Sequence, residues 1–192
     1  MRALVLYAHP CSESFNAAVH DTVVETLTER GWDVDDCDLN AEAFAPVLTE
    51  AERRGYHAVP ENVEPVKSYV ERVKKAEALV MVFPVWNFGY PAILKGFLDR
   101  VFLPDVSFRL VDGKVMPGLT NIKKLAACTT YGGTRWRAFG VGDPPRRCVT
   151  RAVRYACGWP KTRYIALYDM NNNTEGILRS HLNRVRREMR EL

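Results

Sequence analysis

The chain has 192 residues, enough for one domain whose apolar core needs neither disulfides nor a structural metal. It is 47% hydrophobic and 26% charged, with a net charge of +4, which is typical of a globular protein and does not favour nucleic-acid binding. No apolar run approaches the about 18 residues that a membrane span needs. Five scattered cysteines without a C-x-x-C pair predict reduced thiols, and hence a cytoplasmic location. The four histidines lack metal-ligand spacing, so we expect no metal site.

Strand and helix patterns alternate along the chain. Residues 2–8 form an apolar run without polar alternation after Arg2, which is typical of a strand buried on both faces. Phe15 then begins a pattern of apolar residues every four positions, and Gly31 can end that helix. Further strands are predicted at 34–39, 78–83, 125–130 and 164–168. Further helices are predicted from Thr49 to Gly55 with a capping box, at 63–73, from Pro91 to Phe102, at 149–158 and at 178–189.

Five alternations of strand and helix predict an α/β fold, with a parallel sheet that carries helices on both faces. We expect a single domain over residues 1–192, with a small hairpin or flap at about 104–118 around Asp112–Gly113. In a doubly wound sheet of order 2-1-3-4-5, ligands bind beyond the carboxyl ends of the first and third strands, where the strand order reverses. The loops at this edge are His9–Ser14, Pro84–Tyr90 and Thr129–Gly133.

The first loop, A-H-P-C-S-E-S-F-N, opens a helix whose free N–H groups and dipole favour a phosphate or pyrophosphate. His9, Ser12, Ser14 and Asn16 add side-chain donors. The loop has neither a G-x-G-x-x-G nor a Walker pattern, so it indicates neither of those nucleotide-binding classes. The plain alternative is ordinary N-capping by Ser14 or Ser12.

The second and third loops favour a planar ligand. In F-P-V-W-N-F-G-Y-P-A-I-L-K-G-F-L-D-R-V-F, residues 83–102, Trp86 and Phe88 can line an apolar slot or merely cap the core. T-T-Y-G-G, residues 129–133, offers two hydroxyls and two glycines that let the backbone approach a ligand. Together the loops predict a phosphate site beside an apolar slot for a flat heterocycle.

These three motifs resemble those of the flavodoxin-like NAD(P)H:quinone oxidoreductases, a family that includes the modulator of drug activity type. The resemblance runs from Met1 to about Tyr168. It implies a homodimer that holds FAD or FMN, with the helix that begins at Pro91 at the subunit interface. The phosphate residues that it implies are His9, Ser14, Phe15 and Asn16. The isoalloxazine would be lined by Pro84, Val85, Trp86, Asn87 and Phe88. Its pyrimidine side would meet Thr129, Thr130, Tyr131, Gly132 and Gly133.

The function that this resemblance implies is hydride transfer from NAD(P)H through the flavin to a quinone or similar planar acceptor, in a ping-pong reaction. Three alternatives stay open: an FMN-dependent azo- or nitroreductase, a regulatory flavoprotein subunit of a potassium-efflux transporter, and an electron-carrier flavodoxin. FAD or FMN, and NADPH or NADH, also stay open.

The sequence departs from the mammalian-type quinone reductases after the glycine pair. Those enzymes carry a Tyr and a His there that assist hydride transfer, whereas residues 134–154 contain neither. Arg135, Trp136 and Arg137 stand nearby instead. They are candidates either to replace that pair, or to bind the NADPH 2′-phosphate or the acceptor.

Overall fold

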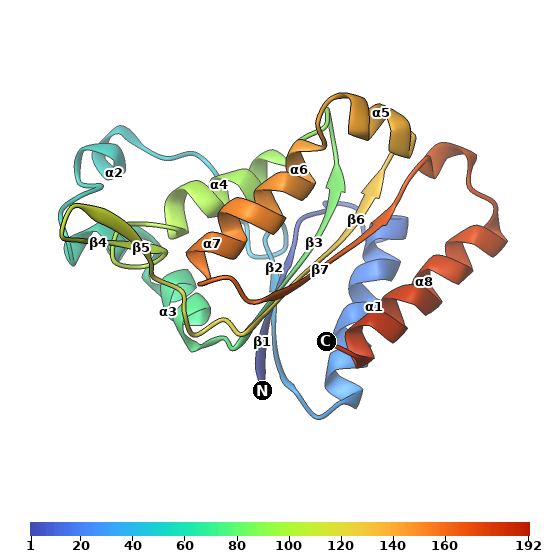
Figure 1. Cartoon of the computed structure of the whole chain (residues 1–192), viewed down its shortest axis with the longest axis horizontal. Helices are drawn as coiled ribbons and strands as arrows, with labels where there is room; N and C mark the ends of the chain where they lie inside the picture. Colours follow the sequence, from blue (N-terminus) through green and yellow to red (C-terminus); the bar gives the residue numbers. More distant parts are fainter.

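The computed structural model describes all residues, 1–192, and its centre is a five-stranded parallel sheet (Figure 1). The strands lie in the order β2-β1-β3-β6-β7, which is 2-1-3-4-5 when only the sheet strands are counted. This confirms the predicted flavodoxin-like fold. The bounds are β1 Arg2–Tyr7, β2 Asp33–Asp38, β3 Ala78–Val85, β6 Lys124–Tyr131 and β7 Lys161–Leu167.

Helices cover both faces of the sheet because both faces of the strands are apolar. All eight residues of β3 are buried. One face packs 16 buried residues under α1 (Phe15–Glu29) and α8 (Glu175–Arg190), which lie side by side (Figure 1). The other face packs 29 buried residues, with α3 (Lys67–Lys75), α4 (Ala92–Val101) and a helical run of α6, η2 and α7. The run comprises α6 Pro144–Arg147, η2 Cys148–Val153 and α7 Arg154–Ala156. None of the helices has the length and apolar character needed to cross a membrane.

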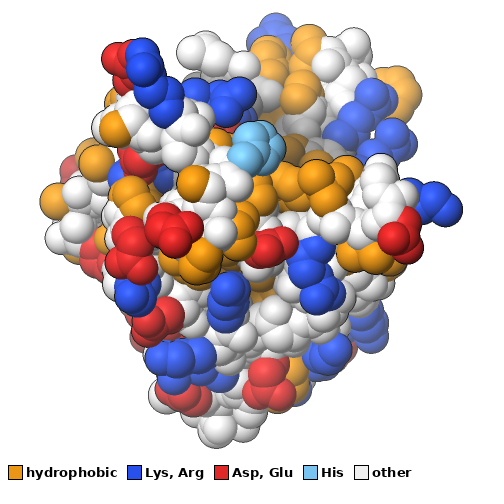
Figure 2. All heavy atoms as spheres, turned by 90° about the vertical axis from the view of Figure 1, so that its left-hand side faces the viewer, with side chains coloured by type: hydrophobic (Ala, Val, Ile, Leu, Met, Phe, Trp, Pro, Cys, Tyr) orange, Lys and Arg blue, Asp and Glu red, His pale blue; other side chains and the backbone are white.

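A hairpin of β4 (Phe108–Val111) and β5 (Lys114–Pro117) lies apart from the main sheet. Its turn residues Asp112 and Gly113 have φ of 50° and 73°, as in the tight turns that match strand twist. On the face that the hairpin shares with α2 (Glu50–Arg54), hydrophobic side chains lie among acidic and basic ones (Figure 2). The exposed hydrophobic residues of the hairpin are Leu110, Val111, Val115 and Met116.

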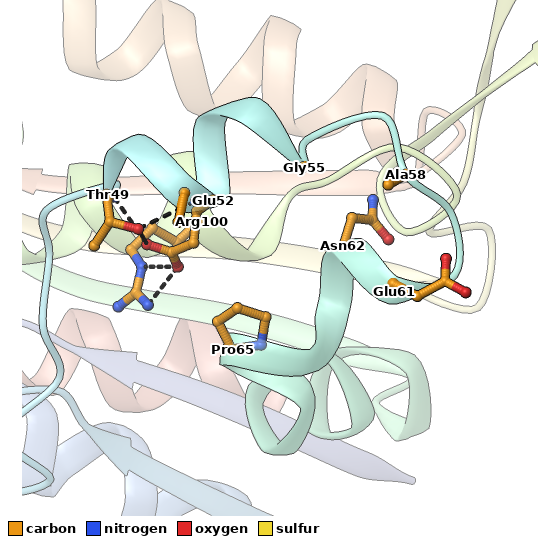
Figure 3. A pocket seen from close by; sticks show the side chains of 9 residues that line it. Thr49, Glu52, Gly55, Ala58, Glu61, Asn62, Pro65 and Arg100 are labelled. Carbon is orange, nitrogen blue, oxygen red and sulfur yellow. Dashed lines mark hydrogen bonds and ion pairs between the residues drawn. The ribbon is translucent and has the colours of Figure 1, made fainter.

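The segment before α3 is fixed to α4 by an ion pair (Figure 3). Thr49 and Glu52 form the predicted capping box of α2, with Glu52 N–H donating to Thr49 Oγ1 at 3.2 Å. Glu52 also pairs with Arg100 of α4, whose Nη2 lies 2.6 Å from its Oε1. Burial raises the pKa of Glu52, but the hydrogen bonds from Thr49 and Arg100 outweigh it and leave the pKa lowered. A short η1 helix (Glu61–Val66) then leads into α3.

Two predicted boundaries at the carboxyl edge were wrong. The third sheet strand does not end before Pro84, because β3 continues to Val85 with Pro84 paired to Thr130 of β6. Pro84 is tolerated because β1 pairs with β3 only as far as Val82, so the missing N–H leaves no ladder partner unmatched. Likewise β6 extends through Tyr131, so the first three residues of the expected third loop belong to a strand.

The stretch after Gly133, expected to be a loop, is largely helical. It forms α5 (Arg135–Gly140), and the helix predicted from 149 already begins with α6 at Pro144. Thr134 caps α5, with its side chain accepting from Arg137 N–H. A short η3 helix, Met170–Asn172, follows β7.

Candidate functional site

The carboxyl edge of the sheet begins with the N-terminus of α1. Ser14 is the N-cap, and its Oγ accepts from Ala17 N–H at 3.1 Å. The capping interpretation is therefore correct for Ser14. The backbone N–H groups of Phe15 and Asn16 have no acceptor within the protein. Because such first-turn groups and the helix dipole attract anions, this end of α1 retains the donors that a phosphate needs.

His9 joins this loop to the second one. Its Nδ1 accepts from Cys11 N–H at 3.1 Å, which leaves Nε2 to carry the proton of the neutral ring. Its ring lies edge-on to Trp86, with centroids 5.7 Å apart. Burial lowers the pKa of His9 below its ordinary value. His9 is therefore a neutral N–H donor at pH 7, placed between the helix terminus and the aromatic loop.

Asn16 and Thr130 meet beneath the edge. Asn16 is only 3% exposed, and its Nδ2 donates to Thr130 Oγ1 at 3.5 Å. Asn16 Oδ1 is buried without any partner. Thr129 Oγ1 also lacks a partner, but it lies on the opposite face of the sheet because side chains alternate along β6. Because buried polar atoms in folded proteins are almost always hydrogen-bonded, the orphaned Asn16 Oδ1 points to a missing polar partner on the α1 side. Phe15 differs, because its ring lies against His181 of α8, so only its backbone faces the loop.

The second loop is a tight turn held in an uncommon conformation. Gly89 N–H donates to Trp86 O at 2.8 Å, and the two residues between them have positive φ, 48° at Asn87 and 56° at Phe88. Asn tolerates this left-handed region, but a bulky aromatic residue adopts it rarely and at a cost. Trp86 remains 47% exposed. The turn therefore presents the Trp86 ring at the surface, whereas the Phe88 ring is half-buried.

The second and third loops enclose a cavity of about 430 Å³. Residues from the two predicted motifs make up its whole lining: Val85, Trp86, Asn87, Phe88, Tyr131, Gly132 and Gly133. A Cβ on Gly133 would stand 3.8 Å from the Phe88 ring, in ordinary contact, so the two loops face each other across the cavity. All seven lining residues belong to the predicted set, whereas Pro84, Thr129 and Thr130 of that set do not line the cavity.

Tyr131 contributes differently from its neighbours, because its side chain is sealed inside the protein. It is 1% exposed, and its hydroxyl lies 2.6 Å from both Asp143 Oδ1 and Tyr164 Oη. Burial raises the pKa of Tyr131. Asp143 also accepts from Arg146 Nε at 2.9 Å, and Arg146 donates to Tyr168 Oη at 3.0 Å. This network supports the Gly132–Gly133 backbone from behind.

The sequence reasoning missed Asp143, Arg146, Tyr164 and Tyr168. The only signal was an acidic residue before two prolines, and it carries no chemistry by itself.

The three residues considered as replacements for the Tyr/His pair do not lie together. Trp136 is 80% exposed on α5. Arg135 lines a separate cavity with Arg146 and other residues of α6, whereas Arg137 lines neither cavity.

Another cavity, of about 450 Å³, adjoins the outer side of the first loop. There His20 stacks on Tyr7 with ring centroids 4.2 Å apart, and its Nε2 lies 2.8 Å from Asp36 Oδ1. Burial lowers the pKa of His20, but the hydrogen bond and charge of Asp36 outweigh it and leave the pKa raised. A cavity of about 400 Å³ between α2 and α4, shown in Figure 3, lies away from the carboxyl edge, and its charged pair is already matched.

Strand order, free N–H groups at the N-terminus of α1 and an apolar slot at the carboxyl edge are typical of a flavodoxin-like protein. A family model described as "Flavodoxin-like fold" matches residues 1–189, and the chain belongs to this family. Within it the chain is a homologue of NAD(P)H:quinone oxidoreductases. It is 29% identical over 163 residues to an uncharacterized NAD(P)H oxidoreductase of Haemophilus influenzae, covering 82% of this chain and 79% of that one.

A second relative is NAD(P)H dehydrogenase (quinone) 1 of Cavia porcellus, 33% identical over 147 residues. The match covers 68% of this chain but only 54% of that enzyme, so the chain spans about half its length. Among solved structures, the NAD(P)H:quinone oxidoreductase of Methanothermobacter marburgensis has a TM-score of 0.83 at 25% identity, covering 99% and 98% of the two chains. An FMN-dependent NADH-azoreductase of Bacillus anthracis, solved with FMN, has a TM-score of 0.79 and covers 98% and 97%; at 14% identity it shows the fold alone.

Proposed function

We propose that this protein is a flavin-dependent NAD(P)H oxidoreductase that reduces a quinone or a similar planar acceptor. The observation that carries the proposal is the 430 Å³ cavity at the carboxyl edge of the sheet, lined entirely by the Val85–Phe88 and Tyr131–Gly133 segments at the ends of β3 and β6. Homology to NAD(P)H:quinone oxidoreductases supports the reaction type. The orphaned Asn16 Oδ1 supports a polar ligand at the same edge.

The residues present suit a flavin. The free N–H groups of Phe15 and Asn16, with the Nε2–H of His9, would hold its phosphate. Trp86 and Phe88 would lie beside its ring system, and the Gly132–Gly133 backbone can approach its polar edge. A bound flavin supplies the two-electron chemistry, accepting hydride from NAD(P)H and delivering it to the acceptor in turn.

The protein's own contribution is binding, orientation and electrostatics. No carboxylate or imidazole lines the cavity, so no side chain there serves as a general acid or base. Backbone N–H groups at Gly132 and Gly133 would stabilise negative charge on a reduced ring. The half-exposed Trp86 leaves one side of the slot open, which allows donor and acceptor to use the same space in succession.

The first experiment is to purify the protein, record its visible spectrum and identify any flavin released by heat. We expect oxidised-flavin absorption, and NAD(P)H oxidation that depends on an added quinone. A colourless protein that takes up neither FAD nor FMN would refute the proposal.

An acceptor panel separates the proposal from its alternatives. Faster turnover with azo or nitro compounds than with quinones would favour the azoreductase alternative. Flavin binding without turnover of any acceptor would favour the regulatory subunit. The homodimer and the cytoplasmic location stay predictions.

A further inference from the structure

A cavity of about 370 Å³ lies immediately beyond the flavin slot and is dominated by arginine. It is lined by Arg135, Phe139, Gly142, Asp143, Arg146, Arg147, Thr150, Arg151 and Tyr168. We call it the arginine cavity. Arg135 is two residues from Gly133 of the slot. Tyr131 lines the slot, and its hydroxyl donates to Asp143, which lines the arginine cavity. Tyr131 therefore lies between the two cavities.

The charge of this cavity is not balanced within the protein. Asp143 is its one carboxylate, and that group is already engaged by Arg146 Nε at 2.9 Å and by Tyr131 Oη. Arg135, Arg147 and Arg151 have no ion pair and no side-chain hydrogen bond. All three are exposed at the surface, so their charge is available to a ligand that enters from solvent.

The geometry of α5 and α6 holds these groups around one space. Arg147 and Arg151 are four residues apart in one helical run, so they project from the same side of it. Gly142 has a φ of 84°, which favours glycine, and the Arg147 guanidinium lies beside it, 3.5 Å from the place where a Cβ would stand. Phe139 of the facing α5 is 75% exposed and offers a flat apolar surface beside the guanidinium groups.

We propose that the arginine cavity binds the adenosine 2′-phosphate end of the electron donor and makes the protein selective for NADPH over NADH. Guanidinium groups bind phosphate through paired N–H donors, and an exposed aromatic ring stacks on a purine. A donor whose nicotinamide occupies the slot must leave its adenosine outside, and the arginine cavity is the adjoining cationic space. The inference rests on the proposed function for the identity of the donor. It replaces Arg137 with Arg147 and Arg151 as the partners of Arg135.

The direct test measures binding without turnover. Calorimetric titration of the flavin-loaded protein with adenosine 2′,5′-bisphosphate should show binding that is at least tenfold tighter than that of adenosine 5′-monophosphate. The double variant Arg147→Gln/Arg151→Gln should lose that difference. Arg184→Gln, an exposed arginine on α8 that lies outside the cavity, should keep it. A melting curve within the wild-type range shows that the double variant is folded.

Kinetics supply the second readout. In the double variant, kcat/KM for NADPH should fall at least tenfold while that for NADH stays within twofold of wild type. Equal losses for both donors, or an unchanged preference, would overturn the inference. So would inorganic phosphate binding as tightly as the bisphosphate, since that describes an unspecific anion site. If the protein binds the bisphosphate in this cavity but holds no flavin, the phosphate site stands and the proposed function is refuted.

Discussion

Gly96 lies at the closest approach between α4 and the chain that precedes α2. A Cβ at this position would stand 2.2 Å from the carbonyl oxygen of Pro46 and 2.5 Å from its Cα. Because the obstacle is backbone rather than a flexible side chain, one of the two segments would have to move. The glycine therefore sets how tightly residues 44–49 lie on α4.

We predict that Gly96→Ala lowers the free energy of unfolding by about 2 kcal/mol, the usual cost of overpacking a core. Urea denaturation measures the change. Gly140→Ala is the matched control, because that helical glycine has nothing within 4 Å of its missing Cβ. The control should be neutral or slightly stabilising. Equal stability of Gly96→Ala and wild type would contradict the close approach.

His181 is a buried base without a hydrogen-bond partner for Nε2. It is 5% exposed against Phe15, and burial, aided by Arg184, lowers its pKa to about 4. In the unfolded chain the pKa returns to about 6.5, so the unfolded state binds more protons between these values. The neutral His181 therefore makes its full contribution to the free energy of unfolding above pH 6.5, and this contribution is lost as the pH falls towards 4.

We predict that wild type loses about 2 kcal/mol more stability than His181→Phe between pH 7 and pH 5. The phenylalanine keeps a ring against Phe15 but cannot be protonated. Urea melts of both proteins at the two pH values give the difference, in which the other titrating groups cancel. Parallel pH profiles for the two proteins would show that His181 is not neutral in the folded state.

At the scale of elements, the Glu52–Arg100 pair connects α2 to α4. The two side chains are only 11% and 10% exposed, so removing one leaves a buried charge without its partner. By contrast, Glu50 and Arg54 form a pair on the same helix α2, but each is 79% exposed. Because Glu50 and Glu52 lie on the same short helix, the two pairs allow a comparison of a solvated and a buried ion pair.

We predict that Glu52→Gln lowers the free energy of unfolding by roughly 3 kcal/mol, since Arg100 then stays buried and uncompensated. Glu50→Gln should leave stability unchanged, because solvent screens that pair. Denaturant melts of the two variants against wild type decide the matter. Equal effects would mean that residues 44–62 are not held by the buried pair.

How well the sequence predicted each element depended on burial. The strands were found because β1, β3 and β6 are apolar runs, and the α2 capping box was found because Thr49 and Glu52 have the required spacing. Helix α5 was missed because Trp136 and Phe139, its large apolar residues, face solvent and give no buried face to recognise.

The candidate site could also be predicted only in part. The residues of the slot could be named because ligands of doubly wound sheets bind at the carboxyl ends of the strands, and the loops after β3 and β6 have a distinctive composition. The contacts of Tyr131 could not be predicted, because Tyr164 lies 33 residues away and Asp143 sits in a segment without a pattern. In the sequence, Arg147 and Arg151 look like ordinary solvated positions of a helix. Only the fold shows that they share a cavity with residues of α5.

At the scale of the whole molecule, several large apolar side chains remain exposed near the carboxyl edge. Trp86 is 47%, Trp136 80% and Val141 51% exposed. Exposed apolar groups of this size close to a cavity are typical of a surface that another molecule covers.

We predict a homodimer, with a mass by light scattering of twice the 21.8 kDa of one chain. The mass should stay constant on dilution through the micromolar range. A monomer at every concentration would contradict this prediction and leave the proposed reaction intact.

The extension of β3 and β6 past the end of β1 has a consequence for hydrogen exchange. Val85 and Tyr131 are ladder partners, as are Pro84 and Thr130, so one wall of the slot is made of sheet backbone. Amides in a ladder exchange with solvent only when the sheet opens, whereas amides in turns exchange readily. We expect Thr130 to exchange as slowly as the strand core, and Asn87 and Gly132 to exchange quickly until a ligand covers them. The strand side of the slot is therefore ordered before any ligand binds, and only the turn side loses conformational entropy on binding.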